Sequence, residues 1–143
     1  AFYETESGDL VAKIQPTELH QSYPGRMHGG IAAAILDETI GRAIAVGKDD
    51  PVWGVTVELT TKYRKPIPLD QDLWIIGRVT KDGSRFFEGS GEIVLESGET
   101  AVSAVGRYLK VPIDKITDAA MDEEDWFLHR LPGDPEAIEV PGR

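Results

Sequence analysis

The stretch HGGIAAAILDETIGRAIAVG, residues 28–47, decides the fold of this chain. It is rich in alanine and apolar on nearly all sides, which is typical of a buried helix rather than a surface helix. We predict one helix over residues 28–46, about 28 Å long at 1.5 Å per residue. Gly47 and Lys48 suit its C-terminal end.

Segments with the period-two pattern of strands flank this helix. A short strand is predicted over residues 10–15, and four more over residues 53–63, 72–80, 85–95 and 100–111. A proline break at residues 65–68, an Asp82-Gly83 turn and a Ser97-Gly98 turn separate the last four. This order predicts an α+β domain in which an antiparallel sheet wraps around one long central helix.

The strand over residues 53–63 has two contrasting faces. Simple alternation places one apolar set on the first face: Trp53, Val55, Val57, Leu59 and Tyr63. It places a polar set on the other: Thr56, Glu58, Thr60 and Lys62. We expect this strand to be an edge of the sheet that a second copy of the chain covers.

Composition narrows the classes of partner and compartment. The 143 residues include no cysteine, which excludes disulfides and thiolate metal sites, and the net charge of −10 disfavours nucleic-acid binding. The longest apolar run, residues 31–36, is too short to span a membrane, and the N-terminus has no signal-like core. We therefore expect a cytoplasmic protein without nucleic-acid or membrane partners.

Acidic residues are concentrated near the C-terminus, between residues 114 and 139. We predict one domain over residues 1–112, followed by an acidic C-terminal tail over residues 113–143. A short helix is expected within residues 113–129, and residues 131–143 are expected to be mobile.

Asp37 is the most informative single residue. It shares a face of the predicted helix with small and apolar residues, where a carboxylate is costly: Gly30, Ala33, Ala34, Ile40, Gly41 and Ile44. The adjacent Glu38 has Arg42 four residues on and can form an ordinary surface ion pair. The pattern leaves two interpretations of Asp37 open, a catalytic carboxylate or one that reaches solvent or caps a neighbouring loop.

His28-Gly29-Gly30 opens the predicted helix. Free N–H groups and the positive end of the helix dipole favour a developing negative charge there, as in an oxyanion hole, where one donor contributes roughly 3–4 kcal/mol. A glycine-rich turn with a structural histidine is the alternative. His20, His28 and His129 lack the spacing of metal ligands, and no G-x-S-x-G motif occurs, so we expect neither a metal nor a serine nucleophile.

Three segments resemble the hotdog-fold acyl-CoA thioesterases of the phenylacetyl-CoA type. The first is SYPGRMHGGIAAAILDETIG, residues 22–41, since in that family His-Gly-Gly starts the central helix and an aspartate follows nine residues after the histidine, as His28 and Asp37 do. GVTVELTTKYRKPIPLDQDLWIIGRV, residues 54–79, is similar to the family's strand, proline break and next strand. SRFFEGSGEIVLESGETAVSAVGRYLKV, residues 84–111, is similar to its closing hairpin.

The resemblance implies hydrolysis of acyl-CoA to a free acid and CoA, without a cofactor. Asp37 would activate water or attack the thioester itself, and the Gly29 N–H would polarise the thioester carbonyl. His28 would orient the loop or contact the substrate, beside Gly30. Thr56 matches a strand hydroxyl that assists the attacking water in some members. Ser22 stands where many members carry asparagine.

The basic residues at strand ends are candidates for the CoA phosphates. They are Arg64, Lys65, Lys81 and Arg85, and solvated strand-end charges are the alternative interpretation of each.

The resemblance also implies a homodimer, and beyond it a homotetramer, in which Gly29 of one subunit faces Asp37 of the other. The spacing agrees, because eight residues span roughly 12 Å along one helix, too far for both groups to touch one thioester carbon.

Two other functions remain open at this stage. One is a hotdog-fold hydratase or dehydratase acting on acyl thioesters, with His28 and Asp37 as its catalytic pair. The other is a non-catalytic acyl-CoA-binding module.

Overall fold

The computed structural model describes residues 1–118 and 131–143. Its regular elements are β1 (Phe2–Glu4), β2 (Leu10–Ile14), α1 (Gly29–Arg42), β3 (Gly54–Tyr63), β4 (Leu73–Asp82), β5 (Phe86–Val94) and β6 (Thr100–Lys110). Short 3-10 turns occupy Glu18–His20, Ala43–Ala45 and Ile113–Lys115. The strands form one antiparallel sheet in the order β1-β2-β4-β5-β6-β3.

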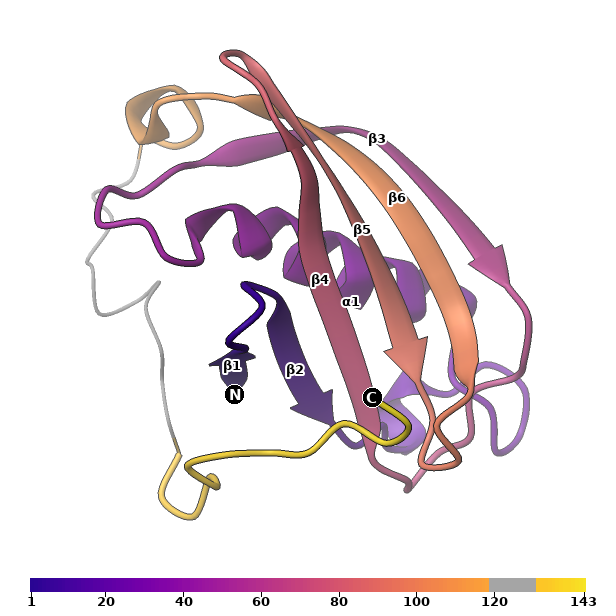
Figure 1. The fold of residues 1–143 in the computed structure, drawn as a ribbon. Helices are drawn as coiled ribbons and strands as arrows, with labels where there is room; N and C mark the ends of the chain where they lie inside the picture. Colours follow the sequence, from indigo (N-terminus) through magenta and orange to yellow (C-terminus); the bar gives the residue numbers. More distant parts are fainter. Residues whose placement is uncertain (119–130) are drawn as a thin grey trace.

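The sheet curves around α1, which lies along its concave face (Figure 1). This arrangement confirms the predicted α+β class with a hotdog architecture, and each predicted strand is present with end shifts of one or two residues. The three-residue β1 was not predicted. The α-helix ends at Arg42 rather than at residue 46, because the Ala43 N–H is shared between the carbonyls of Ile40 and Thr39 and the chain tightens into a 3-10 turn.

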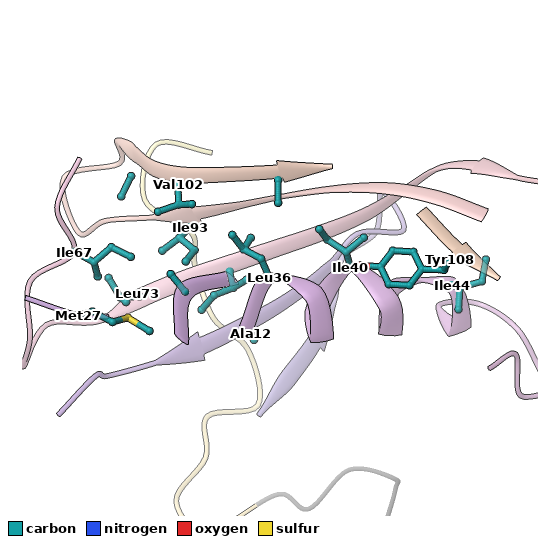
Figure 2. Close-up of a cluster of buried hydrophobic side chains, with 14 of the residues drawn as sticks. Ala12, Met27, Leu36, Ile40, Ile44, Ile67, Leu73, Ile93, Val102 and Tyr108 are labelled. Atoms are coloured by element: carbon teal, nitrogen blue, oxygen red, sulfur yellow. The ribbon is translucent and has the colours of Figure 1, made fainter. Parts of the chain in front are cut away.

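The core lies between α1 and the sheet. Leu36 and Ile40 are fully buried and point from the helix toward the strands (Figure 2). The helix approaches β4 closely because Gly77 has no side chain; a Cβ there would lie 2.6 Å from the Thr39 carbonyl oxygen. Packing of this face of α1 on the sheet therefore also fixes the position of Asp37, the residue that follows Leu36.

β3 is an edge strand in the described chain, as predicted: it pairs with β6 on one side only. Val55 and Val57 on this strand are 43% and 56% exposed, and Val105 on neighbouring β6 is 59% exposed. Exposed valines along an unpaired edge are suited to pairing with another strand.

The end of the C-terminal segment, residues 138–143, lies against the face of the sheet turned away from α1 (yellow in Figure 1). Ile138 and Val140 pack there on a cluster of Val11, Trp74, Ile76 and Val94. The Arg143 guanidinium donates to the Glu92 carboxylate at 2.8 Å. Of the helix expected within residues 113–129, a 3-10 turn at Ile113–Lys115 lies in the described chain and residues 119–130 lie outside it. Neither described range holds a helix long and apolar enough to cross a membrane.

Candidate active site

Asp37 lies at the centre of a hydrogen-bonded group that joins α1 to the edge of the sheet. Thr56 Oγ1 on β3 lies 2.9 Å from Oδ1 and 3.0 Å from Oδ2 of its carboxylate. Tyr108 Oη on β6 donates to Oδ1 at 3.0 Å and to the Asp37 main-chain oxygen at 3.2 Å. Two hydroxyls from different strands thus hold one carboxylate, and Asp37 is half-buried there.

A β-bulge brings Thr56 to this position. Thr56 pairs with Tyr108 and Glu58 pairs with Arg107, so Val57 is the extra residue. Thr56 therefore shares the inner face with Leu59 and Tyr63, while Val55 and Glu58 lie on the outer face. The predicted alternation holds after the bulge, where Leu59 and Tyr63 lie opposite Glu58. It was wrong for Val55 and Thr56 because it assumed an unbroken strand.

Tyr108 was not predicted as a site residue. Its side chain is 1% exposed and stacks on Phe87 with ring centroids 4.8 Å apart. A Cβ on Gly106 would lie 2.7 Å from this ring, so the chain leaves room for it. Burial, and then the charge and hydrogen bond of Asp37, hold the pKa of the Tyr108 phenol well above its ordinary range. Tyr108 is therefore a fixed hydrogen-bond donor, since a buried tyrosine hydroxyl needs an acceptor.

Glu38 forms the predicted ion pair with Arg42 on the exposed side of the helix. This confirms the contrast between the two acids, since Glu38 has a cation and Asp37 has hydroxyl partners.

A cavity of about 550 Å³ opens beside Asp37. Its walls come from the C-terminal half of α1, the loop that follows, the start of β3 and residues after β6. Apolar side chains contribute much of the lining, among them Phe2, Val52, Trp53, Ile113 and Ile116. A cavity of this size is within the range of small-molecule sites.

The N-terminus of α1 forms a second group, away from this cavity. His28 is the N-cap, and its Nδ1 accepts the Gly30 N–H at 2.8 Å. The Gly29 carbonyl accepts from the Tyr63 hydroxyl at 2.5 Å. Within the described chain no group accepts from the Gly29 N–H. The His28 ring therefore caps the helix by accepting the Gly30 N–H, whereas the Gly29 N–H remains available as a donor.

A second hollow of about 370 Å³ lies beside Gly29. Arg26, Arg64 and Lys65 line it together with Tyr63. Arg64 also donates to Ser103 Oγ at 2.5 Å, and Lys65 pairs with Glu99.

The remaining predicted contact residues lie apart from each other. Ser22 is exposed in the loop before α1, where its N–H donates to the Arg26 carbonyl at 2.9 Å. Arg85 directly precedes β5 at the opposite end of the sheet from Arg64, with its guanidinium 5.8 Å from the centre of the Phe86 ring. Lys81 lies at the end of β4, in the hairpin that joins β4 to β5. One chain therefore does not bring the four basic candidates together.

The sequence of this chain is similar to those of known thioesterases. Residues 24–102 match the family model of the thioesterase superfamily. Acyl-coenzyme A thioesterase 13 of Homo sapiens is 25% identical over 103 residues, which are 72% of each chain.

Two solved structures share the fold. A hypothetical thioesterase protein from Streptococcus pneumoniae, solved with coenzyme A, has a TM-score of 0.69 at 22% identity and covers 78% of this chain and 87% of its own. The PaaI protein of E. coli, from the phenylacetic acid degradation operon, has a TM-score of 0.70 at 17% identity. The match covers 78% of this chain and 79% of the PaaI chain. The family model spans more than half of the 143 residues and includes both His28 and Asp37, and the chain therefore belongs to the thioesterase superfamily.

Proposed function

We propose that this chain is an acyl-CoA thioesterase whose active site forms between two copies of the chain. Its family makes it a thioester hydrolase. The name of its human relative, an acyl-coenzyme A thioesterase, supports acyl-CoA as the thioester. Two groups each supply part of such a site and lie apart in one chain. They are the Asp37 carboxylate, which two hydroxyls hold, and the available Gly29 N–H, and their separation is the observation that carries the proposal.

Asp37 is the catalytic carboxylate in this proposal. As a general base it removes a proton from water, the hydroxide adds to the thioester carbonyl, and the C–S bond then breaks as CoA leaves with the proton. As a nucleophile it attacks the carbonyl itself, and the C–S bond breaks as the CoA thiolate leaves. Water then cleaves the resulting anhydride, which releases the acid, regenerates the Asp37 carboxylate and supplies the proton that the thiolate takes up. Thr56 and Tyr108 orient the carboxylate in either route, and its position at the cavity wall gives it access to a bound thioester.

Gly29 supplies the oxyanion donor. Its N–H belongs to the first turn of α1, where the helix dipole favours negative charge on the carbonyl oxygen. Eight residues along α1 separate Gly29 from Asp37, roughly 12 Å, whereas a reacting carbon must lie about 3 Å from each group. One chain cannot supply both.

A second copy paired along β3 resolves this separation. The strand edge is unpaired in the described chain, and its exposed valines would be covered by an antiparallel copy of the same strand. α1 packs beneath β3, so the two helices would also run antiparallel. Gly29 of one copy then approaches Asp37 of the other, and two equivalent sites result.

The capping role of His28 argues against a hydratase or dehydratase. Nδ1 of the ring accepts the Gly30 N–H, which engages this nitrogen in holding the helix start. That chemistry usually uses a free histidine next to an acid, and the acid beside the cavity is held by hydroxyls instead.

The direct test measures the hydrolysis of a panel of acyl-CoA thioesters through the release of the free CoA thiol. We expect wild-type turnover and a loss of at least about a hundredfold in Asp37→Asn, the low end for a general acid–base group. Glu38→Gln is the matched control and should change turnover far less, because Glu38 pairs with Arg42. Near-normal turnover by Asp37→Asn would place the chemistry elsewhere, and no hydrolysis of any acyl-CoA would contradict the substrate class.

A further inference from the structure

We infer that the cavity beside Asp37 holds the acyl group and selects uncharged, apolar acyl groups over those that end in a carboxylate. The inference rests on the proposed function. It concerns which end of the substrate enters the cavity and which chemical class of acyl group fits there.

The two hollows of the chain have opposite charge. Among the described residues, five acidic and two basic side chains line the cavity at Asp37: Glu4, Asp37, Glu38, Asp49 and Asp50 against Arg42 and Lys48. Of residues 1–118 and 131–143, three basic side chains and no acidic one line the hollow at Gly29: Arg26, Arg64 and Lys65. The phosphates of CoA are strongly anionic, so the second hollow attracts them and the first repels them.

This asymmetry orients the substrate in the proposed dimer. The Gly29 hollow of one copy would adjoin the Asp37 cavity of the other, with the thioester between them. CoA then enters from the basic side. The acyl group extends into the acidic and apolar cavity, because that is the remaining space on the far side of the reacting carbon.

Both basic residues that the described chain contributes to the cavity lining are already paired. Arg42 is bound to Glu38, and its guanidinium lies 5.0 Å from the centre of the Phe2 ring. Lys48 is 2.7 Å from a carboxylate oxygen of Asp82. A carboxylate at the end of an acyl chain would have to break one of these pairs or remain unpaired.

The other acids of the lining oppose such a carboxylate. Glu4, Asp49 and Asp50 have no ion pair among the described residues. A buried or half-buried charge without a partner beside like charges is unfavourable, which is how a site rejects a competing ligand. The apolar part of the lining, with Trp53 and Ile116, instead favours hydrocarbon or aryl groups.

The test compares hexanoyl-CoA with adipyl-CoA, which has the same six-carbon chain and a terminal carboxylate. We expect kcat/KM for hexanoyl-CoA to be higher by at least about tenfold. Equal kcat/KM for the two substrates, or a preference for adipyl-CoA, would overturn the inference and leave the proposed function intact. No hydrolysis of either would overturn the inference, whereas the proposed function fails only if the whole panel of acyl-CoA thioesters is left unhydrolysed.

A charge-reversal variant identifies the cause of the preference. Asp50→Lys should narrow the ratio of hexanoyl-CoA to adipyl-CoA several-fold by raising kcat/KM for adipyl-CoA. Glu139→Lys makes the same change in net charge on the exposed C-terminal segment, away from the cavity lining, and should leave the ratio at its wild-type value. If both variants change the ratio equally, or neither does, the lining of this cavity does not set the selectivity and the inference fails.

Discussion

The phenol of Tyr108 binds Asp37 at two points, with Oη 3.0 Å from the carboxylate Oδ1 and 3.2 Å from the main-chain oxygen of the same residue. The ring that carries this hydroxyl is buried, stacked on Phe87 and seated over Gly106. The position of the carboxylate is therefore set by a rigid strand residue as well as by its own helix. Tyr108 is a positioning residue for Asp37.

Tyr108→Phe should keep the fold and impair the reaction. The ring still fills its place, but the Asp37 carboxylate loses a donor that stabilises its charged form. We expect kcat to fall roughly tenfold, since one hydrogen bond to a charged group is worth roughly 1.5–3 kcal/mol, with little change in KM.

A fall in kcat at an unchanged KM separates positioning of Asp37 from a merely structural role of Tyr108. The charged groups around the same cavity, Glu38, Arg42, Lys48, Asp49, Asp50 and Glu4, are unchanged in the variant. Tyr3→Phe is the matched control, because the Tyr3 hydroxyl donates to the Pro135 carbonyl, far from Asp37 in the sequence and outside the cavity lining. A Tyr108→Phe enzyme with the wild-type kcat would contradict this role.

Thr56→Val should also reduce kcat more than it raises KM. Valine has the shape of threonine without the hydroxyl that lies 2.9 and 3.0 Å from the Asp37 oxygens. Thr56→Ser keeps that hydroxyl and should retain most of the activity. Steady-state kinetics of the two variants check this, and equal losses in both would contradict a specific role for the Thr56 hydroxyl.

Arg64→Ala and Arg85→Ala should each raise KM for acyl-CoA. On a short thioester that lacks the CoA nucleotide, both variants should behave nearly as wild type, because phosphates are the proposed partners of these side chains. Arg64 lines the hollow beside Gly29, and Arg85 lies at the other end of the sheet. In the proposed antiparallel dimer Arg85 would approach the same hollow of the second copy. Equal effects on both substrates would argue against phosphate contact.

Glu92 links the C-terminal segment to the sheet, and its effect on stability should depend on pH. Burial raises the pKa of Glu92, but hydrogen bonds from Arg143 and Thr100, with the charge of Arg143, outweigh burial and lower the pKa below its ordinary value of 4.5. A carboxyl whose pKa is lowered by folding stabilises the folded state above its unfolded pKa, and this stabilisation is lost as pH falls through the folded pKa. Glu92→Gln should therefore lower the Tm at about pH 7 and lower it less at about pH 3. A Tm difference that is the same at both pH values would contradict the linkage.

Local patterns in the sequence predicted most of the fold. Residues 28–46 have the alanine-rich apolar pattern of a buried helix, and the strands alternate at period two between clear turn signals, so α1 and five strands could be assigned. β1 was missed because three residues, Phe2–Glu4, are too few for a period to show. The helix end was misplaced by four residues because the sequence stays helix-like through the 3-10 turn at Ala43–Ala45.

Contacts between distant segments limited the prediction of the site. The aspartate was conspicuous because its helix neighbours are small and apolar, whereas Tyr108 is 71 residues away and resembles any other core aromatic. The bulge at Val57 depends on the register of β3 against β6, which no pattern within residues 54–63 specifies. Reading Thr56 as an inward residue therefore required the family resemblance or the structure.

The proposed two-subunit site predicts how two inactive variants behave when their subunits are combined. Gly29→Pro removes the proposed N–H donor, and the first turn of a helix tolerates proline. His28 has the extended conformation, φ −66° and ψ 130°, that a residue before proline prefers. Gly29→Ala is the control: its Cβ would meet the Tyr63 ring at 3.3 Å while the N–H remains, so it should stay active if Tyr63 moves slightly.

The most direct measurement is complementation between Asp37→Asn and Gly29→Pro subunits. Each variant alone should be folded and inactive. A mixed dimer contains one site with both defects and one with neither, so equal mixing with free subunit exchange should restore about a quarter of wild-type activity. If mixed dimers form, as shown by mass spectrometry of differently tagged subunits, and activity does not return, each site is built from a single chain and the account is contradicted.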